Sequence, residues 1–191
     1  MRAKVWLESF FKHLNEIDDK ELDDQLPSGR WTEIVSQVMD KIGEDLYCGV
    51  SGRKSNISPQ EESREYLTID FMFFNKKDYN EDKSVLPSAV VEHENNPSRK
   101  KIEYCLWKIS CVKSPLRVLI CYQPNADKIE SLREHLEVVV WEGNLMKGDN
   151  ADLLIIIGDS SLDNSADSEW NEYFRVFEWR NDSLKVSKMV T

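Results

Sequence analysis

The chain has 191 residues and a formal net charge of −10 at pH 7, with 40% hydrophobic residues and six tryptophans. This length and hydrophobicity suffice for a sizeable core, so we expect a single folded domain over residues 1–191. The acidic charge argues against a protein that coats nucleic acid without specificity, because such binding depends on neutralising phosphates. No apolar run approaches the length needed to span a membrane.

The N-terminal segment lacks the pattern of a secretory signal peptide, because Glu8, Lys12 and His13 interrupt its apolar residues. The four cysteines form no CxxC pair; they are Cys48, Cys105, Cys111 and Cys121. We expect them to be buried, reduced thiols, as in a reducing compartment. The sequence therefore predicts a cytoplasmic protein with no membrane partner.

The first part of the chain is predicted to be mainly helical. Apolar residues recur at helical spacing over residues 3–16 and again over about 30–46, where Glu33 lies beside the apolar stripe. A polar break with Pro27 and Gly29 separates the two helices. A short strand at residues 47–50 and a polar loop follow.

Two strands then carry acidic residues. Residues 65–74, EYLTIDFMFF, read as a strand with Asp70 at its centre, where Asp is unusual. Residues 88–94 read as a buried strand that ends in Glu92, His93 and Glu94. Because side chains alternate across a strand, Glu92 and Glu94 should point to one face and His93, which we interpret as structural, to the other.

The second half alternates helices and strands. A patterned helix is predicted over about 98–112, with Lys101, Tyr104 and Lys108 along one flank of its apolar stripe. Buried strands are predicted at residues 116–122 and 151–158, with a helix at about 127–136 between them. Residues 138–141 fit either a continuation of that helix or a short strand. Two amphipathic strands, residues 172–178 and 183–190, follow.

The acidic residues predict a metal site. The polar connection between residues 74 and 88 favours an antiparallel return, which would bring Asp70 beside Glu92 and Glu94. Carboxylate oxygens suit Mg²⁺ or Mn²⁺. Two alternatives stay open: a strand end that runs into solvent, and a buried Asp that only accepts hydrogen bonds.

The order of these elements and their acidic residues resembles the PD-(D/E)xK, or restriction-endonuclease-like, nuclease superfamily. The residues that carry the resemblance are Asp70, the run AVVEHEN at residues 89–95, and the following helix and strand, IEYCLWKIS and LRVLICY. The resemblance implies an α/β fold with an αβββαβ core over about residues 31–122 and a mixed central sheet flanked by helices. The N-terminal helix (residues 1–25) and the C-terminal strands (residues 150–190) would be additions.

The resemblance also implies roles for individual residues. Asp70, Glu92 and Glu94 would bind Mg²⁺ or Mn²⁺, and Glu94 would also orient water. The family usually has Lys where this chain has Glu94. Some members carry Glu there and others move the Lys to the next helix, so Lys108 or Lys101 is the candidate replacement, with Lys108 favoured. Glu33 matches the acid that the first helix often contributes.

The expected function is Mg²⁺-dependent hydrolysis of phosphodiester bonds in DNA, in restriction, defence or repair. DNA or another nucleic acid would be the partner, with a protein partner or a homodimer as further options. The alternative is a protein of the same fold that does not cut and acts as a binding or regulatory subunit. The retained acids favour the enzyme, whereas the missing lysine at position 94 and the acidic charge favour the subunit.

Overall fold

A computed structural model describes residues 1–17, 28–52, 66–79, 85–162 and 170–187. The helices are α1 Ala3–Leu14, α2 Ser28–Asp45, α3 Lys76–Tyr79, α4 Arg99–Ser110, α5 Ala126–Glu142 and α6 Trp170–Tyr173, with a 3₁₀ turn at Tyr66–Thr68. The strands are β1 Cys48–Gly52, β2 Phe71–Asn75, β3 Ala89–Glu94, β4 Leu116–Gln123, β5 Asp152–Asp159, β6 Phe174–Arg180 and β7 Ser183–Val186. In these parts of the chain, no helix is long and apolar enough to span a membrane.

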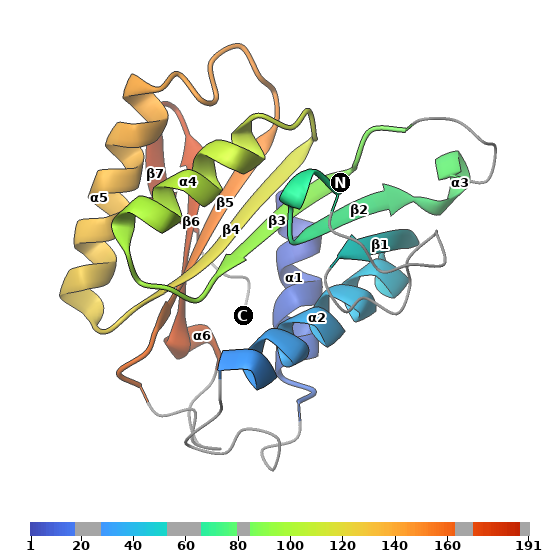
Figure 1. Cartoon of the computed structure of the whole chain (residues 1–191), viewed down its shortest axis with the longest axis horizontal. Helices are drawn as coiled ribbons and strands as arrows, with labels where there is room; N and C mark the ends of the chain where they lie inside the picture. The colour runs from blue at the N-terminus through green and yellow to red at the C-terminus, as the bar shows by residue number, and fades with distance from the viewer. Residues whose placement is uncertain (18–27, 53–65, 80–84, 163–169, 188–191) are drawn as a thin grey trace.

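The described strands form one mixed sheet in sequence order, β1 to β7 (Figure 1). The pairs β3–β4 and β4–β5 are parallel, and α4 and α5 make the two connections. The other neighbouring pairs are antiparallel. The predicted α/β class with a mixed sheet flanked by helices is therefore confirmed, as is the antiparallel return from β2 to β3.

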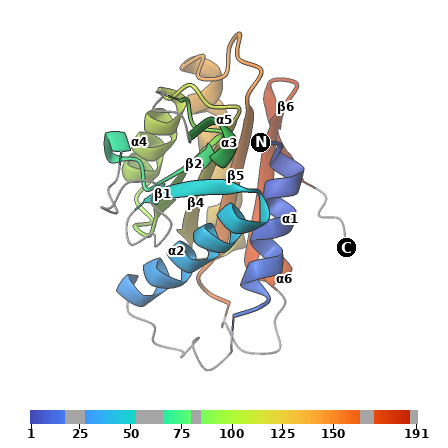
Figure 2. The ribbon, with the colours of Figure 1, turned by 90° about the vertical axis from the view of Figure 1, so that its right-hand side faces the viewer.

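Helices cover both faces of the sheet, with α1 and α2 on one side and α4 and α5 on the other (Figure 2). The alternation along β3 explains which residues meet which helices. Val91 packs into the core cluster that contains α1 and α2, whereas Val90 packs into the cluster that contains α4 and α5. By the same alternation, Glu92 and Glu94 belong to the α4 face and His93 to the α2 face.

The strand predicted at residues 65–74 is shorter than expected, and residue 65 lies outside the described residues. The chain forms a 3₁₀ turn before β2, and Leu67 and Thr68 have φ angles of 53° and 57°. A positive φ cannot continue an extended strand. Asp70 therefore does not lie at the centre of a strand, as predicted, but directly before the first residue of β2, Phe71.

Other differences from the prediction are local. Residues 138–141 continue helix α5, which resolves the alternative of a short strand. The polar connection after β2 contains the short helix α3. The last two strands span 174–180 and 183–186, and residues 188–190 of the predicted final strand lie outside the described residues. Cys48, Cys105 and Cys121 are buried and unpaired as expected, but Cys111 is exposed because it follows the last turn of α4.

Asp45, the last residue of α2, joins this helix to α1. Its carboxylate accepts hydrogen bonds from Ser9 Oγ at 2.9 Å and from Lys12 Nζ at 3.0 Å, and it contacts His13 Nε2 at 2.9 Å. The hydrogen bond from Lys12 is the largest cause that lowers the pKa of Asp45 to about 2. Three partners from one helix thus hold the two helices of this layer together.

We predict that Asp45→Asn lowers the free energy of unfolding at pH 7 by about 1–3 kcal/mol, because it removes charge-assisted hydrogen bonds. Since the pKa of Asp45 is lowered from 3.8 to about 2, its stabilisation is complete above pH 3.8 and is lost as the pH falls through about 2. In denaturant unfolding between pH 2 and 7, the free energy of unfolding of the variant should therefore fall less steeply toward acid pH than that of the wild type. Glu8→Gln, which removes only the exposed Lys4–Glu8 pair, should change stability by less than about 0.5 kcal/mol.

Candidate functional site

Asp70 and Glu92 meet where β2 begins and β3 approaches its end. Phe71 pairs with Val91, so the next residues outward in the antiparallel register are Asp70 and Glu92. The Asp70 N–H donates to Glu92 Oε1 at 3.1 Å, and the His93 N–H donates to Asp70 Oδ2 at 2.8 Å. Each carboxylate therefore accepts a hydrogen bond from the main chain of the other segment, and the predicted proximity of Asp70 and Glu92 is confirmed.

Lys108 reaches these acids from α4. Its Nζ lies 2.8 Å from Glu92 Oε2 and donates to the main-chain oxygen of Thr68 at 2.6 Å. The side chain of Lys108 is 16% exposed and that of Glu92 is 2% exposed, so this ion pair is largely withdrawn from water. Buried charges are costly unless they are paired, and the positively charged Lys108 partly compensates for the buried Glu92.

The electrostatics of Glu92 remain unfavourable for its charged form. Burial first, and the neighbouring charge of Asp70 second, raise the pKa of Glu92 to about 7, although the hydrogen bond and charge of Lys108 oppose the shift. For Lys108, burial alone would lower the pKa, but the contact with Glu92 more than offsets it and raises the pKa. The pair of acids would thus gain from more positive charge than one lysine supplies.

Glu94 completes one wall of the same cavity. Its Oε1 accepts the N–H of Asn96 at 2.7 Å, and Cys105 Sγ from α4 lies 3.9 Å from its Oε2. The cavity has a volume of about 320 Å³ and is partly enclosed by α4. Its lining residues are Thr32, Asp70, Phe71, Glu92, His93, Glu94, Asn95, Tyr104, Cys105 and Lys108. The three predicted carboxylates and Lys108 therefore line a single hollow.

The imidazole of His93 lies on the opposite face of the sheet, as the alternation predicts. Its Nε2 is 2.8 Å from Tyr122 OH, which also accepts a hydrogen bond from Trp31 Nε1 at 2.6 Å. Burial lowers the pKa of His93 to about 4, so the ring is neutral at pH 7. His93 thus connects β3 to β4 and α2 through Tyr122, which agrees with a structural role.

Two of the candidates lie elsewhere. Glu33 is exposed on α2 and is not part of the described cavity wall, whereas its neighbour Thr32 is. Thr32 Oγ1 accepts a hydrogen bond from Asn95 Nδ2 at 3.1 Å, which ties α2 to the end of β3. Lys101 is exposed on the first turns of α4 and lines a different groove. Lys108, and not Lys101, is the lysine that contacts Glu92.

The donor chemistry of the cavity fits a hard cation. Carboxylate oxygens are the ligands that Mg²⁺ prefers, and Mg²⁺ keeps several waters, so Asp70 and Glu92 with water would suffice to hold it. Among the described residues, no group of three or more His, Cys, Asp or Glu side chains is positioned to hold a metal ion in this conformation. Glu94 Oε2 faces Cys105, so Glu94 would have to rotate its side chain to serve as a third protein ligand.

Comparisons of the chain with protein-family models, curated proteins and solved structures find no match. The resemblance to the nuclease superfamily therefore depends on the motif residues and on the order of the elements.

Sequence reasoning missed several cavity residues. Thr32 carries no motif signal, and its contact with Asn95 joins residues 63 positions apart. Cys105 reads as a core residue of α4, and it is indeed buried while its Sγ faces Glu94. The carbonyl of Thr68 positions Lys108 only because the chain turns before β2, and the sequence pattern favoured a strand there.

We predict that Glu92 makes the protein less stable as the pH rises from 4.5 to 7. Because its pKa in the folded state is raised from 4.5 to about 7, the folded state binds the proton more tightly than the unfolded state in this window. The effect approaches about 1.4 kcal/mol per pH unit. Glu92→Gln should remove it in denaturant unfolding between pH 4.5 and 8.

Asp70→Asn is the matched test of the cause. It can still accept the N–H of His93 but lacks the charge that repels Glu92. The pH range over which Glu92 lowers the stability of the protein should therefore shift to lower values in this variant. An identical pH dependence in wild type and Glu92→Gln would contradict the account of Glu92.

Proposed function

We propose that the protein is a Mg²⁺- or Mn²⁺-dependent nuclease that hydrolyses phosphodiester bonds in DNA and has a restriction-endonuclease-like core. The observation that carries the proposal is the 2.8 Å contact between Lys108 and Glu92, with Asp70 alongside, in a cavity at the end of β3. The order α2, β1, β2, β3, α4 and β4 supports the αβββαβ core. A setting in restriction, defence or repair belongs to the same proposal.

Each residue has a role that its position supports. Asp70 and Glu92 would hold the metal ion, which when bound would polarise a phosphoryl oxygen and lower the pKa of a bound water. A nearby cation favours the charged form of Glu92, so metal binding would release the proton that its raised pKa retains. Glu94 on the same wall would accept a hydrogen bond from water and orient it.

Lys108 would stabilise the charge that develops on the phosphate. A lysine has three N–H donors, and the ammonium of Lys108 contacts Glu92 and the carbonyl of Thr68. A third donor can therefore point to a phosphate oxygen in the cavity. These two contacts fix the ammonium before substrate arrives, which is the arrangement that makes an electrostatic contact effective in catalysis.

The alternative is a nuclease-fold protein that binds without cutting. One observation favours it: Asp70 and Glu92 each accept a main-chain N–H from the opposite strand, as structural acceptors do. Position 94 also holds Glu rather than the lysine of the family motif. In this case the lysine–carboxylate contact would stabilise the end of the sheet only.

We predict that Mg²⁺ or Mn²⁺ raises the melting temperature of the wild-type protein, because a ligand that binds only the folded state stabilises it. The increase should disappear in Asp70→Asn and Glu92→Gln, which each remove one metal-binding charge. Differential scanning fluorimetry over a metal titration is the measurement, with Glu8→Gln as a control that removes a distant surface acid. An equal increase in all four proteins would show that the ion binds elsewhere.

We predict that Lys108→Ala lowers the single-turnover rate of DNA cleavage by about two to three orders of magnitude, the scale of losing one preorganised electrostatic contact. Affinity for DNA should fall much less, since one phosphate contact is a small share of the total. Lys113→Ala, which removes an exposed lysine just beyond α4, is the matched control and should cut at the wild-type rate.

The outcomes of the cleavage assay separate the two functions. Metal-dependent cleavage that is lost in Glu92→Gln and impaired in Lys108→Ala supports the nuclease with both roles. Cleavage lost in Glu92→Gln but retained in Lys108→Ala would keep the nuclease and remove the role of Lys108. No cleavage by the wild type of single-stranded or duplex DNA with either metal would favour the non-cutting protein.

A further inference from the structure

Two aromatic side chains on α4 are exposed next to the cavity. Tyr104 is 57% exposed and Trp107 is 51% exposed. The three-residue spacing places both rings on the same side of the helix, with their centroids 5.8 Å apart and their planes inclined by 29°. Contiguous exposed apolar patches on a protein surface often mark interaction sites.

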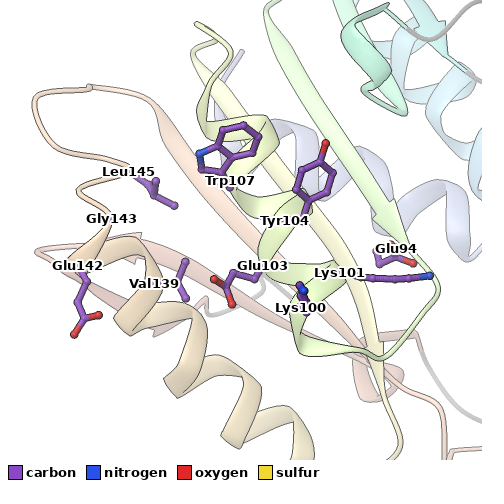
Figure 3. Close-up of a pocket in the computed structure, with 10 residues that line it drawn as sticks. All are labelled: Glu94, Lys100, Lys101, Glu103, Tyr104, Trp107, Val139, Glu142, Gly143 and Leu145. Carbon is purple, nitrogen blue, oxygen red and sulfur yellow. The ribbon is translucent and has the colours of Figure 1, made fainter.

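The two rings form one wall of a groove between α4 and the C-terminal end of α5. The groove has a volume of about 830 Å³, and Val139 and Leu145 form its opposite, apolar wall. Figure 3 shows Tyr104 and Trp107 projecting from α4, with Val139 and Leu145 across from them. This volume lies within the range of roughly 300–1,000 Å³ that is typical of ligand-binding pockets.

The groove leads into the acid–lysine cavity, which is the hollow lined by Asp70, Glu92, Glu94 and Lys108. Glu94 and Tyr104 line both hollows. Lys108 Nζ lies 5.9 Å from the centroid of the Tyr104 ring and 2.8 Å from Glu92 Oε2. A ligand that lies on Tyr104 would therefore extend directly to the carboxylates.

Basic residues at one end of the groove can contact phosphates, although three acids also line it and the whole chain has a net charge of −10. Arg99, Lys100 and Lys101 are exposed on the first turns of α4, and Lys100 and Lys101 line the groove. Two of the acids that line the groove have other polar contacts. Glu103 Oε2 is 3.1 Å from His135 Nε2, and Glu94 Oε1 accepts the N–H of Asn96. Figure 3 shows Glu142, the third acid, pointing away from the two rings.

We propose that this groove binds single-stranded nucleic acid, with bases stacked on Tyr104 and Trp107 and phosphates near Lys100 and Lys101. Aromatic rings beside lysines are the usual means of binding single strands, because every base has a face that can stack. Bases within a duplex are already stacked on each other and do not offer that face. The inference rests on the proposed function and specifies its substrate class: a single-stranded segment that enters the cavity along α4.

The test is fluorescence anisotropy in EDTA, which prevents cleavage. The probes are labelled oligo-dT and oligo-rU of about 15 nucleotides, and a mixed-sequence DNA strand of the same length, alone and as a duplex. Wild type should bind the single strands more tightly than the duplex. Trp107→Ala should weaken single-strand binding about tenfold or more, the scale of losing one stacked base, and Trp107→Phe should restore most of the affinity.

Trp141→Ala is the matched control, since Trp141 is 60% exposed on α5 but does not line the groove. Its affinity should stay within about twofold of wild type, against about tenfold for a lost stacked base. Comparison of oligo-dT with oligo-rU shows whether the strand is DNA or RNA.

Three results would overturn the inference: Trp107→Ala binding like wild type, the duplex binding more tightly than the single strand, or no oligonucleotide binding at all. If the last result came with self-association that Trp107→Ala abolishes, the groove would be an interface between copies of this chain.

Cleavage measured on the same proteins separates this inference from the proposed function. Single-strand binding that depends on Trp107, without metal-dependent cleavage, would support the groove as a binding site and contradict the nuclease function. Duplex cleavage by the wild type, with a Trp107→Ala variant that retains full affinity, would support the nuclease function and contradict the role of the groove in binding single strands.

Discussion

The buried carboxylate of Glu92 is the constraint on which the architecture of this site depends. A charged group that is 2% exposed beside a second carboxylate is unfavourable unless the surrounding structure compensates for it. The compensation comes from the Asp70 N–H of the adjacent chain segment and the Lys108 ammonium of α4. The pKa of Glu92 nevertheless stays raised, to about 7. The charged form of Glu92 would therefore be favoured by a further cation, which is the role of the metal ion in the proposed function.

The sheet places that demand next to a second feature of α4. Because side chains alternate along β3, Glu92 and Glu94 both face α4, which carries Lys108 toward the acids and Tyr104 and Trp107 toward solvent. One helix therefore contributes to the acid–lysine cavity and to the aromatic groove beside it. A single strand of nucleic acid bound along the groove would bring its phosphates to the carboxylates without a large rearrangement of the protein.

The features that depend on local periodicity could be predicted from the sequence. The alternation along residues 89–94 predicted the common face of Glu92 and Glu94 and the opposite face of His93. The family resemblance, together with the flank position on the helix, indicated Lys101 or Lys108. Several features that depend on distant contacts could not be predicted. The turn at Leu67 and Thr68 displaced Asp70 from the centre of a strand, although antiparallel pairing still brought it to Glu92. The family resemblance made Glu33 a candidate, but the packing of α2 places Thr32 in the cavity wall. The groove was also missed, since Val139 and Leu145 reach α4 only through the fold.

The proposed cation site consists of Asp70 and Glu92 at the end of β3. Paramagnetic line broadening by Mn²⁺ in a backbone amide NMR spectrum tests it directly, because broadening is strongest for nuclei close to the ion. Substoichiometric Mn²⁺ should first broaden the amide signals of Asp70 and His93, and Glu92→Gln should prevent this. Broadening spread over the acidic surface, or unchanged broadening in Glu92→Gln, would contradict the proposed site.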